Sequence, residues 1–163
     1  MTVELDELEA VYRDGYERFL RVASVIAGDE ALGADAVHDA FVRAIRSRAS
    51  YRREAPVEAW VWQIVVNAAR DRRRSATTDD EWTPESCEDT PSVNGSSDDP
   101  LALRPWLASL PERQRTVVFL RYFADLDYQG IASVLGIEVG TVSATLSAAH
   151  ARLRALKQQE VER

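Results

Sequence analysis

The stretch that decides the fold runs from Asp127 to Leu156 and begins with DYQGIASVLGIEVGTV over residues 127–142. Its first apolar residues recur at helical spacing and give a short helix one apolar face: Ile131, Ala132 and Leu135. Gly136 follows at once, where a helix ends best with a residue that tolerates positive φ. A second helix begins near Val139, and its apolar positions recur at steps of four and three: Val142, Leu146, Ala149 and Leu153.

Two helices joined by a short turn that contains Gly predict a helix-turn-helix. Asp127 stands where the first helix needs an N-terminal cap. In this motif the second helix enters a DNA major groove with its N-terminal residues facing the base edges. A plain helical hairpin in a bundle core has the same apolar spacing. The small Ala132 at the helix crossing and the Gly140-Thr141-Val142 start of the second helix favour DNA binding.

The remaining pattern predicts an all-α protein with two small helical domains. Helices are expected over residues 3–27, 31–48 and 57–74, a loop over 49–55, and further helices over 101–109 and from 112 to about Ala124. The second helix of the helix-turn-helix is expected to run to Leu156. Leu5 and Tyr12 fall on the apolar face of the 3–27 helix, and Ile45 falls on the inner face of the 31–48 helix. Residues 75–100 are rich in Thr, Ser, Asp, Glu, Pro and Gly, a composition that cannot bury enough apolar surface to order itself. The expected domains are therefore 1–74 and 101–163, joined by a flexible acidic linker over 75–100.

Charge is distributed very unevenly along the 163 residues. The net charge is −7, which alone argues against a nucleic-acid binder. Residues 40–76, however, hold nine arginines and three acidic residues, whereas residues 77–100 hold eight acidic residues and no base. A cluster of Arg70, Arg72, Arg73 and Arg74 closes the 57–74 helix. Compensation of the helix dipole explains part of such a cluster, but four arginines in five residues favour a patch that faces phosphates.

Several classes of protein are not supported by the sequence. No apolar run approaches the roughly 18 residues of a membrane span, and the acidic N-terminus lacks the basic start of a signal peptide. The single Cys87 cannot form an internal disulfide, so we expect a cytoplasmic protein with no membrane insertion. His38 and His150 lie in separate domains with no cluster of ligands nearby, and Cys87 has no base fixed beside it. We therefore expect no metal, no cofactor and no enzymatic activity.

Motifs in both domains resemble those of bacterial RNA polymerase sigma factors of the extracytoplasmic-function type in the sigma-70 family. Residues 36–44 (AVHDAFVRA) are similar to the family's polymerase-binding helix, and residues 51–55, 59–64 and 67–71 to its segment that reads the minus-ten element. The Leu110-Pro-Glu-Arg-Gln-Arg run, residues 120–123 and the helix-turn-helix resemble its promoter-binding C-terminal domain. The resemblance covers about residues 30–75 and 105–156, in the family's order.

The resemblance implies a transcription initiation factor that binds core RNA polymerase and directs it to promoters. It implies docking on the clamp of the largest subunit through the 31–48 helix and a contact with the flap of the beta subunit. The polymerase-binding candidates are Asp35, His38, Asp39, Val42, Arg43 and Arg46. His38 departs from the family, in which Gln is common at this position. An anti-sigma factor that covers both domains is a further implied partner.

The same resemblance assigns the melted minus-ten strand to the 49–55 loop and the 57–74 helix. A flipped base needs hydrogen-bond donors and a stacking surface. The candidates are Tyr51, Arg52, Arg53, Glu54, Trp62, Asn67, Arg70, Arg73 and Arg74. Packing and capping are the alternative roles for Tyr51 and Asn67, and Trp60 is expected in the core. The two promoter elements lie somewhat under two duplex turns apart, each about 34–36 Å.

The C-terminal domain is expected to bind the minus-thirty-five element as duplex. Its candidates are Arg113, Arg115, Arg121, Tyr128, Gln129, Thr141, Ser143, Thr145, Ser147, His150 and Arg152. One departure matters, because the family carries basic residues on the recognition helix and this chain has none there before Arg152. Ser and Thr discriminate bases weakly, and bidentate contacts from Arg to guanine are unavailable. Weak minus-thirty-five binding that depends on backbone contacts is therefore expected.

Two other functions remain open at this point. A helix-turn-helix regulator that acts without polymerase would use residues 101–156 and leave the 31–74 resemblance unexplained. A protein-only adaptor would account for the poor recognition helix. DNA binding that requires polymerase separates the first interpretation from both.

Overall fold

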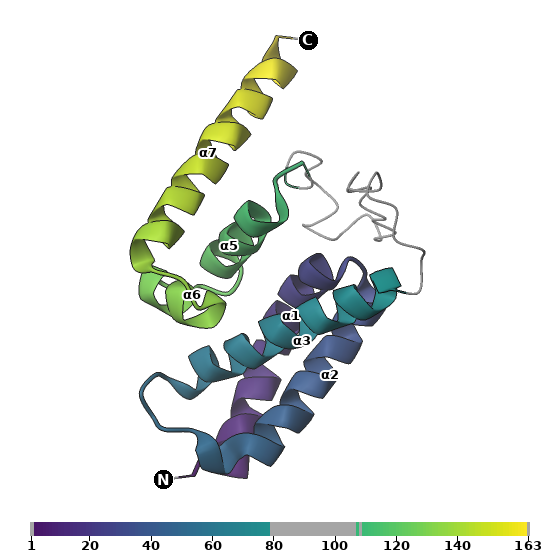
Figure 1. The fold of residues 1–163 in the computed structure, drawn as a ribbon, viewed down its shortest axis with the longest axis vertical. Helices are drawn as coiled ribbons and strands as arrows, with labels where there is room; N and C mark the ends of the chain where they lie inside the picture. Colours follow the sequence, from purple (N-terminus) through teal and green to yellow (C-terminus); the bar gives the residue numbers. More distant parts are fainter. Residues whose placement is uncertain (1, 79–106, 108, 163) are drawn as a thin grey trace.

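The computed structural model describes residues 2–78, 107 and 109–162, and every regular element in these residues is a helix (Figure 1). The prediction of an all-α fold is confirmed. The N-terminal unit consists of α1 (Leu5–Ala27), α2 (Glu30–Ser47), the short 3₁₀ helix η1 (Arg48–Ser50) and α3 (Val57–Thr78). The C-terminal unit consists of α5 (Glu112–Tyr122), α6 (Tyr128–Leu135) and α7 (Val139–Val161).

Capping residues set several of the helix ends. Asp29 accepts a hydrogen bond from the backbone N–H of Leu32 at 2.7 Å and begins α2, directly after Gly28 has ended α1 at a φ of 100°. Asp127 accepts from the N–H of Gly130 at 2.7 Å, and Gly136 ends α6 at a φ of 65°. The cap and the stop predicted for the helix-turn-helix are therefore confirmed.

Aromatic rings fill the core of the N-terminal unit, where α1, α2 and α3 pack on one another. The ring of Phe19 lies 4.4 Å from that of Trp62 and 5.5 Å from that of Phe41, centroid to centroid. Gly15 makes room for this arrangement, since a Cβ at that position would lie 2.6 Å from the Phe19 ring. The cost of a glycine inside a helix is thus offset by close ring packing.

Three residues expected on inner faces are instead exposed. Leu5, Tyr12 and Ile45 retain 49%, 42% and 43% of their accessible surface. Helical periodicity placed them with the core, but α3 covers only one side of the α1–α2 pair. The prediction was wrong for these positions because periodicity defines a stripe and does not say how much of it another helix covers.

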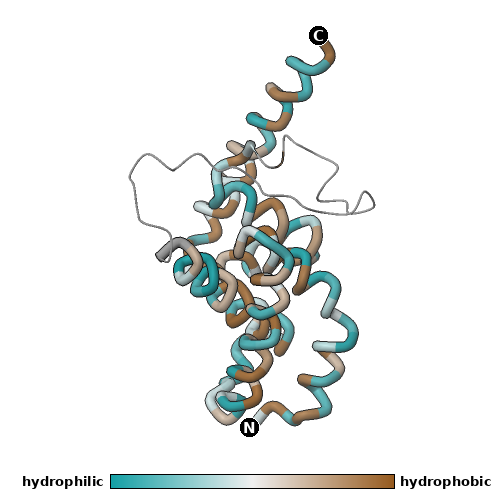
Figure 2. Tube along the Cα trace, turned by 90° about the vertical axis from the view of Figure 1, so that its right-hand side faces the viewer, coloured by the Kyte–Doolittle hydropathy of each residue, from teal (hydrophilic) through white to brown (hydrophobic). Residues whose placement is uncertain are grey.

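The C-terminal unit is a helix-turn-helix with a supporting helix. α6 and α7 meet at 104°, within the range of this motif. The inward positions predicted for α7 are buried as far as Ala149, whereas the C-terminal half of the helix extends away from the rest of the unit (Figures 1 and 2). α7 continues to Val161, beyond the expected end at Leu156, and α5 ends at Tyr122 rather than near Ala124.

The two units pack against each other. α3 contacts α6 and α1 contacts α5, so the buried apolar residues form one continuous cluster. Val134 of α6 is buried although it lies off the predicted inner face, because α6 packs against α3 as well as α5 and α7. α3 reaches Thr78, four residues past its expected end. The helix expected over 101–109 lies outside the described residues except at Leu107 and Ser109.

Candidate polymerase and nucleic-acid interfaces

Half of the predicted polymerase-binding residues of α2 are engaged with α3. Asp39 accepts a hydrogen bond from Nε of Arg72 at 2.9 Å, and Asp35 lies 3.8 Å from Nη1 of the same guanidinium. Arg43 forms an ion pair with Asp71 at 3.2 Å. The hydrogen bond to Asp39, followed by the charges of Asp39 and Asp35, raises the pKa of Arg72 against the opposing effect of desolvation. These contacts fasten α2 to α3, and Asp39 in particular is engaged by Arg72.

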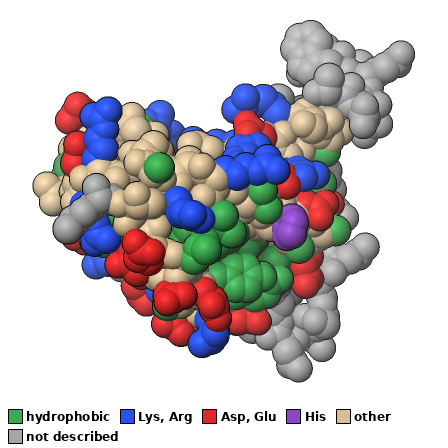
Figure 3. All heavy atoms as spheres, turned by 90° about the horizontal axis from the view of Figure 1, so that it is seen from below, with side chains coloured by type: hydrophobic (Ala, Val, Ile, Leu, Met, Phe, Trp, Pro, Cys, Tyr) green, Lys and Arg blue, Asp and Glu red, His purple; other side chains and the backbone are tan. Residues whose placement is uncertain are grey.

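The other half of the set lies on an open face of α2. His38, Val42 and Arg46 follow one another at helical spacing, and none of their side chains has a described hydrogen bond or ion pair. Ile45 shares this face, and Leu5 and Tyr12 of α1 add two more exposed apolar residues. Figure 3 views the end of the molecule where α1 begins and α2 finishes, and hydrophobic side chains gather there inside a charged border. Sequence reasoning missed Leu5, Tyr12 and Ile45 as surface residues.

Tyr51 packs within the protein and does not present its ring to solvent. Its exposed fraction is 7%, its hydroxyl donates to the carbonyl of Ala55, and its ring lies 5.1 Å from that of Trp60. The expectation of a base-stacking Tyr51 is therefore corrected, because this side chain closes the loop that precedes α3. Arg52 and Glu54 of the loop are exposed, and Arg53, at a φ of 56°, approaches Glu7 at 3.4 Å.

Trp62 is a core residue. It is fully buried against Phe19, and its Nε1 has no hydrogen-bond partner. The assignment of Trp62 to the minus-ten surface is wrong, because the side of α3 that carries it faces α1. Trp60, which was expected in the core, is half-buried and packs on Tyr51. Asn67 is exposed on α3 and remains available.

The arginines at the C-terminal end of α3 do not form one patch. Arg72 is turned toward α2, as described above, and Arg73 forms an ion pair with Glu112 of the C-terminal unit at 3.2 Å. Arg70 lines a pocket between the two units, whereas Arg74 is exposed. The interpretation of the cluster as a single phosphate-facing patch is therefore corrected.

Before Arg152, the recognition helix α7 presents mainly small and hydroxylic side chains, as the sequence indicated. Ser143 and Ser147 are exposed, and the hydroxyl of Thr145 donates to the carbonyl of Thr141 at 2.7 Å. His150 Nε2 lies 2.9 Å from the hydroxyl of Tyr122. The hydroxyl of Thr145 and His150 Nε2 are therefore occupied within the unit, which leaves Ser143, Ser147 and the half-buried Thr141 as the residues of this stretch whose hydroxyls have no partner among the described residues.

Two of the arginines expected to contact DNA instead form hydrogen bonds to backbone carbonyls within the C-terminal unit. Arg115 donates to the carbonyl of Leu110 at 3.0 Å, and Arg121 donates to that of Leu126 at 3.2 Å. The Arg121 guanidinium also lies 5.9 Å from the ring centre of Tyr128, which is exposed at the start of α6. Three further members of the predicted set are exposed, namely Arg113, Gln129 and Arg152, whereas Thr141 is half-buried.

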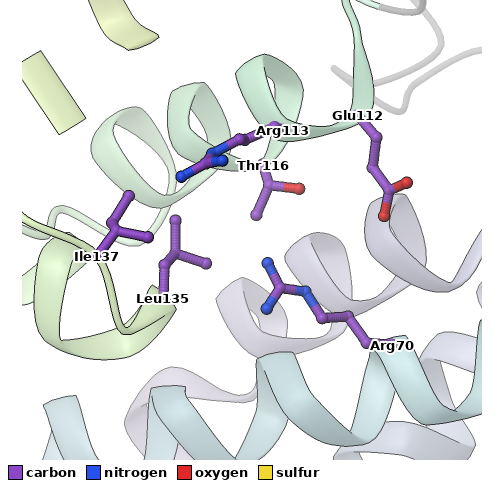
Figure 4. A pocket seen from close by; sticks show the side chains of 6 residues that line it. All are labelled: Arg70, Glu112, Arg113, Thr116, Leu135 and Ile137. Carbon is purple, nitrogen blue, oxygen red and sulfur yellow. The ribbon is translucent and has the colours of Figure 1, made fainter. Parts of the chain in front are cut away.

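A pocket of about 420 Å³ lies between the units. Its lining comes from α3, α5, α6 and the turn after α6: Arg70, Glu112, Arg113, Thr116, Leu135 and Ile137. In Figure 4 the guanidinium of Arg70 points from α3 toward Thr116 and Leu135. Neither Arg70 nor Arg113 forms an ion pair with any of the described residues.

The described residues form no metal site. No group of three or more His, Cys, Asp or Glu side chains is placed to hold a metal ion there. No single helix among these residues has the length and apolar character needed to cross a membrane. The bent pair α6–α7 reaches this length and apolar character only when its two helices are taken together.

Comparison with known proteins identifies the family. Residues 11–78 match sigma-70 region 2, and residues 102–153 match sigma-70 region 4. The sequence is 31% identical to the ECF RNA polymerase sigma factor SigL of Mycobacterium tuberculosis, over 92% of this chain and 86% of that protein. It is 28% identical to the RNA polymerase sigma factor YlaC of Bacillus subtilis, over 97% of both.

Two solved structures share the fold. CnrH in complex with the cytosolic domain of CnrY matches with a TM-score of 0.69 at 21% identity, over 93% of this chain and 88% of that one. The sigma factor RpoE in complex with the anti-sigma factor NepR, from Bartonella quintana, matches with a TM-score of 0.63 at 25% identity, over 94% and 93%.

A three-helix unit that matches sigma-70 region 2, followed by a helix-turn-helix unit that matches sigma-70 region 4, is the architecture of a promoter-directing factor. The chain belongs to the sigma-70 family, as an extracytoplasmic-function sigma factor, and its function is transcription initiation with core RNA polymerase at promoters.

Proposed function

We propose that the N-terminal unit docks on the clamp of the polymerase through the open face of α1 and α2. The observation that carries this proposal is the exposed apolar group of Leu5, Tyr12 and Ile45 beside His38, Val42 and Arg46. Exposed apolar groups of this kind, bordered by polar residues, mark sites of protein association. Asp35, Asp39 and Arg43 support the site indirectly, because their ion pairs with α3 hold α2 in position.

The minus-ten element is assigned to the exposed polar residues around the loop that precedes α3. Arg52, Arg53, Glu54 and Asn67 offer the donors and acceptors that a displaced single strand needs. Arg70, Arg73 and Arg74 supply positive charge for its phosphates. Tyr51 shapes the loop through its hydrogen bond to Ala55 rather than by stacking on a base.

The minus-thirty-five element is assigned to the helix-turn-helix, with α7 in the major groove. Ser143 and Ser147 face the bases, and Arg113, Gln129 and Arg152 contact the backbone. Because the recognition helix carries no Arg before Arg152, the phosphate contacts supply most of the affinity and the discrimination is low. An anti-sigma factor is the expected regulator. A cytoplasmic location and the lack of a catalytic role follow from the same assignment.

Run-off transcription with bacterial core polymerase tests this assignment. The templates are the region upstream of the protein's own coding sequence and a promoter library, each with and without the protein. Transcripts that start at defined promoters only when both components are present are the expected result. Absence of such transcripts together with absence of core binding would remove the proposal and direct attention to DNA binding without polymerase.

A further inference from the structure

The first turn of α1 contacts the segment that joins α2 to α3, and the proposed function gives it no role there. Figure 1 shows the start of α1 beside the end of α2. Val3 is fully buried, and its N–H donates to the carbonyl of Arg48 in η1 at 3.4 Å. Four residues later, Oε2 of Glu7 lies 3.4 Å from Nη2 of Arg53. The start of α1 is therefore attached to both η1 and the loop that follows it.

Arg53 has an unusual backbone conformation. Its φ is 56°, in the left-handed region that residues other than glycine rarely adopt. Asn and Asp enter this region more easily because their short side chains can hydrogen-bond locally, and arginine lacks this advantage. Such a conformation persists only where surrounding groups hold it. The ion pair with Glu7 is one such group, because it fixes the far end of the Arg53 side chain.

Glu7 is itself held by the helix that carries it. Its Oε2 accepts a hydrogen bond from the N–H of Glu4 at 3.2 Å, as in a capping box at the start of α1. The same oxygen approaches Arg53, so the start of the helix orients the carboxylate toward the loop. The contact with Arg53 is made through Nη2, which leaves other donors of the guanidinium for a second partner.

The loop has a second attachment at its other side. The buried Tyr51 donates its hydroxyl to the carbonyl of Ala55, which ties the two ends of the loop together. Arg52 and Glu54 lie between these attachments and are exposed. The backbone at Arg53 therefore decides the directions in which these two neighbours project.

We propose that Glu7 is a positioning residue for the minus-ten loop. By holding Arg53 in its left-handed conformation, Glu7 sets the directions in which Arg52 and Glu54 meet the displaced strand. A loop ordered before binding loses less conformational entropy when the strand binds, so its affinity for the strand is higher. Glu7 acts through Arg53 and makes no contact with DNA. This inference rests on the proposed function.

The charge of Glu7 distinguishes positioning from a plain electrostatic effect. A carboxylate that only lies near phosphates repels them, so its removal strengthens binding. A carboxylate that positions Arg53 has the opposite effect. Glu7→Gln is the informative variant, because an amide can still cap α1 but offers no charge to Arg53. Glu9→Gln is the matched control, since it removes the same charge from the other side of α1, where Glu9 pairs with Arg13.

Limited digestion with trypsin reports on the loop in the free protein, without DNA or polymerase. The rates of cleavage after Arg52 and Arg53 are followed by mass spectrometry. Because the ion pair joins side chains that are 43% and 42% exposed, Glu7→Gln should speed cleavage about 2- to 5-fold. Glu9→Gln should be cleaved there at the wild-type rate. An unchanged rate in Glu7→Gln overturns the inference.

Binding of the minus-ten strand is measured in the complex with core polymerase. The probe is a labelled non-template single strand from a promoter that gives transcripts in the run-off assay, and the reference strand has the same bases in scrambled order. Glu7→Gln should lower the ratio of the two affinities about 2- to 5-fold, whereas Glu9→Gln should leave it unchanged. A purely structural role would not alter this ratio. If the ratio for Glu7→Gln equals that of the wild type, the inference is wrong.

Arg53→Gly tests the route by which Glu7 acts. Glycine adopts a positive φ without steric cost, so the loop can keep its backbone conformation with no guanidinium for Glu7 to hold. In this background Glu7→Gln should change neither the cleavage after Arg52 nor the ratio of affinities. A full effect of Glu7→Gln in the glycine background would also overturn the inference, because Glu7 would then act on something other than Arg53.

The two proposals fail in different ways. If core polymerase does not bind and no transcripts start, the proposed function fails, and faster digestion of Glu7→Gln would still show that Glu7 holds the loop. If transcripts start at promoters while Glu7→Gln behaves as Glu9→Gln does, the positioning role fails and the proposed function stands.

Discussion

At the scale of single residues, ion pairs and aromatic contacts show which side chains stabilise the N-terminal unit and which remain open to a partner. Asp39 and Asp35 stand on the same helix and approach the same guanidinium, but Asp39 makes the short hydrogen bond and Asp35 is 62% exposed. Trp62 and Trp60 stand two residues apart, and the structure fully buries Trp62, which was expected on the minus-ten surface.

Asp39→Ala should lower the free energy of unfolding by about 1 kcal/mol, because it leaves Arg72 without its closest partner. Asp35→Ala is the matched control and should change the free energy of unfolding by less than about 0.5 kcal/mol. Urea denaturation followed by circular dichroism measures both. Equal effects from the two variants would contradict the assigned roles.

The pairing of Arg72 should not make stability depend on pH near neutrality. Its pKa is raised in the folded state, so its contribution is fully present below the pKa of the unfolded chain and is lost only as pH rises past the folded value. Both values lie far above neutral pH. The loss in free energy of unfolding caused by Arg72→Met should therefore be constant between about pH 7 and 10. A smaller loss at the upper end of this range would show that Arg72 titrates there.

Trp62→Ala should cost about 3–5 kcal/mol of stability, since it removes a large buried side chain from the packed rings. Trp62→Phe should cost much less, because it also removes a buried N–H that has no partner. Neither change should alter the affinity for a minus-ten single strand under conditions where the protein is folded. Fluorescence anisotropy of a labelled oligonucleotide measures that affinity, and a large loss for Trp62→Phe would restore a base-reading role.

At the scale of elements, α2 and α7 each present one face whose chemistry sets what it can bind. α2 offers apolar side chains beside Arg46 and His38, whereas the first turns of α7 offer small and hydroxylic ones and the exposed Val139. The first face suits a protein partner because burial of apolar area drives association. The second face suits close approach to DNA, with little sequence readout of its own.

Ile45→Glu should weaken core-polymerase binding at least tenfold, because docking would bury an unpaired carboxylate. The fold should be unaffected, since Ile45 is already exposed. Ala10→Glu, at an exposed position on another side of α1, is the control and should bind normally. Biolayer interferometry with immobilised core polymerase provides the measurement, and normal binding by Ile45→Glu would move the docking surface elsewhere.

Ser143→Arg should strengthen binding to promoter duplex and steepen its salt dependence. One added phosphate contact changes the slope of log K against log salt by about 0.9. Gln158→Arg adds the same charge at the far end of α7, which does not enter the groove, and should leave the slope unchanged. Titrations at several salt concentrations distinguish the two variants. Equal slopes would indicate that the N-terminal turns of α7 do not face DNA.

At the scale of the whole molecule, the arrangement of the two units decides which charges are available. Several arginines of the basic block, residues 40–76, are paired with acidic side chains. Arg43 and Arg72 pair between α2 and α3, and Arg73 pairs with Glu112 of the C-terminal unit. The eight acidic residues of 77–100 have no base among them. All eight lie outside the described residues, so their role remains a prediction from the sequence.

Replacing those eight acidic residues by Asn and Gln should weaken the complex with core polymerase. The reason is the hypothesis that their charge occupies a polymerase channel built for nucleic acid. The control replaces the serines and threonines that follow Thr78 in the linker by Asn, which keeps the charge. Run-off transcription and core binding are measured together. Initiation that is unchanged by neutralisation would reject the hypothesis.

The sequence by itself determined the helices, their caps and the family, because these depend on local patterns. Asp127, Gly136 and the apolar spacing of α7 specify a helix-turn-helix whatever surrounds it. The absence of basic residues before Arg152 in the recognition helix is likewise a property of the sequence. The structure adds only that the hydroxyl of Thr145 and His150 Nε2 already have hydrogen-bond partners within the C-terminal unit.

Only the tertiary structure decided which side of a helix is covered and which charge is paired. Periodicity could not show that Ile45 and Tyr12 are exposed or that Tyr51 and Trp62 are buried. It also could not show that Arg72 pairs with Asp39. Each of these outcomes depends on residues far away in the chain, whose positions follow from packing. The contact between Arg73 and Glu112 joins the two units for the same reason, and no local pattern predicts it.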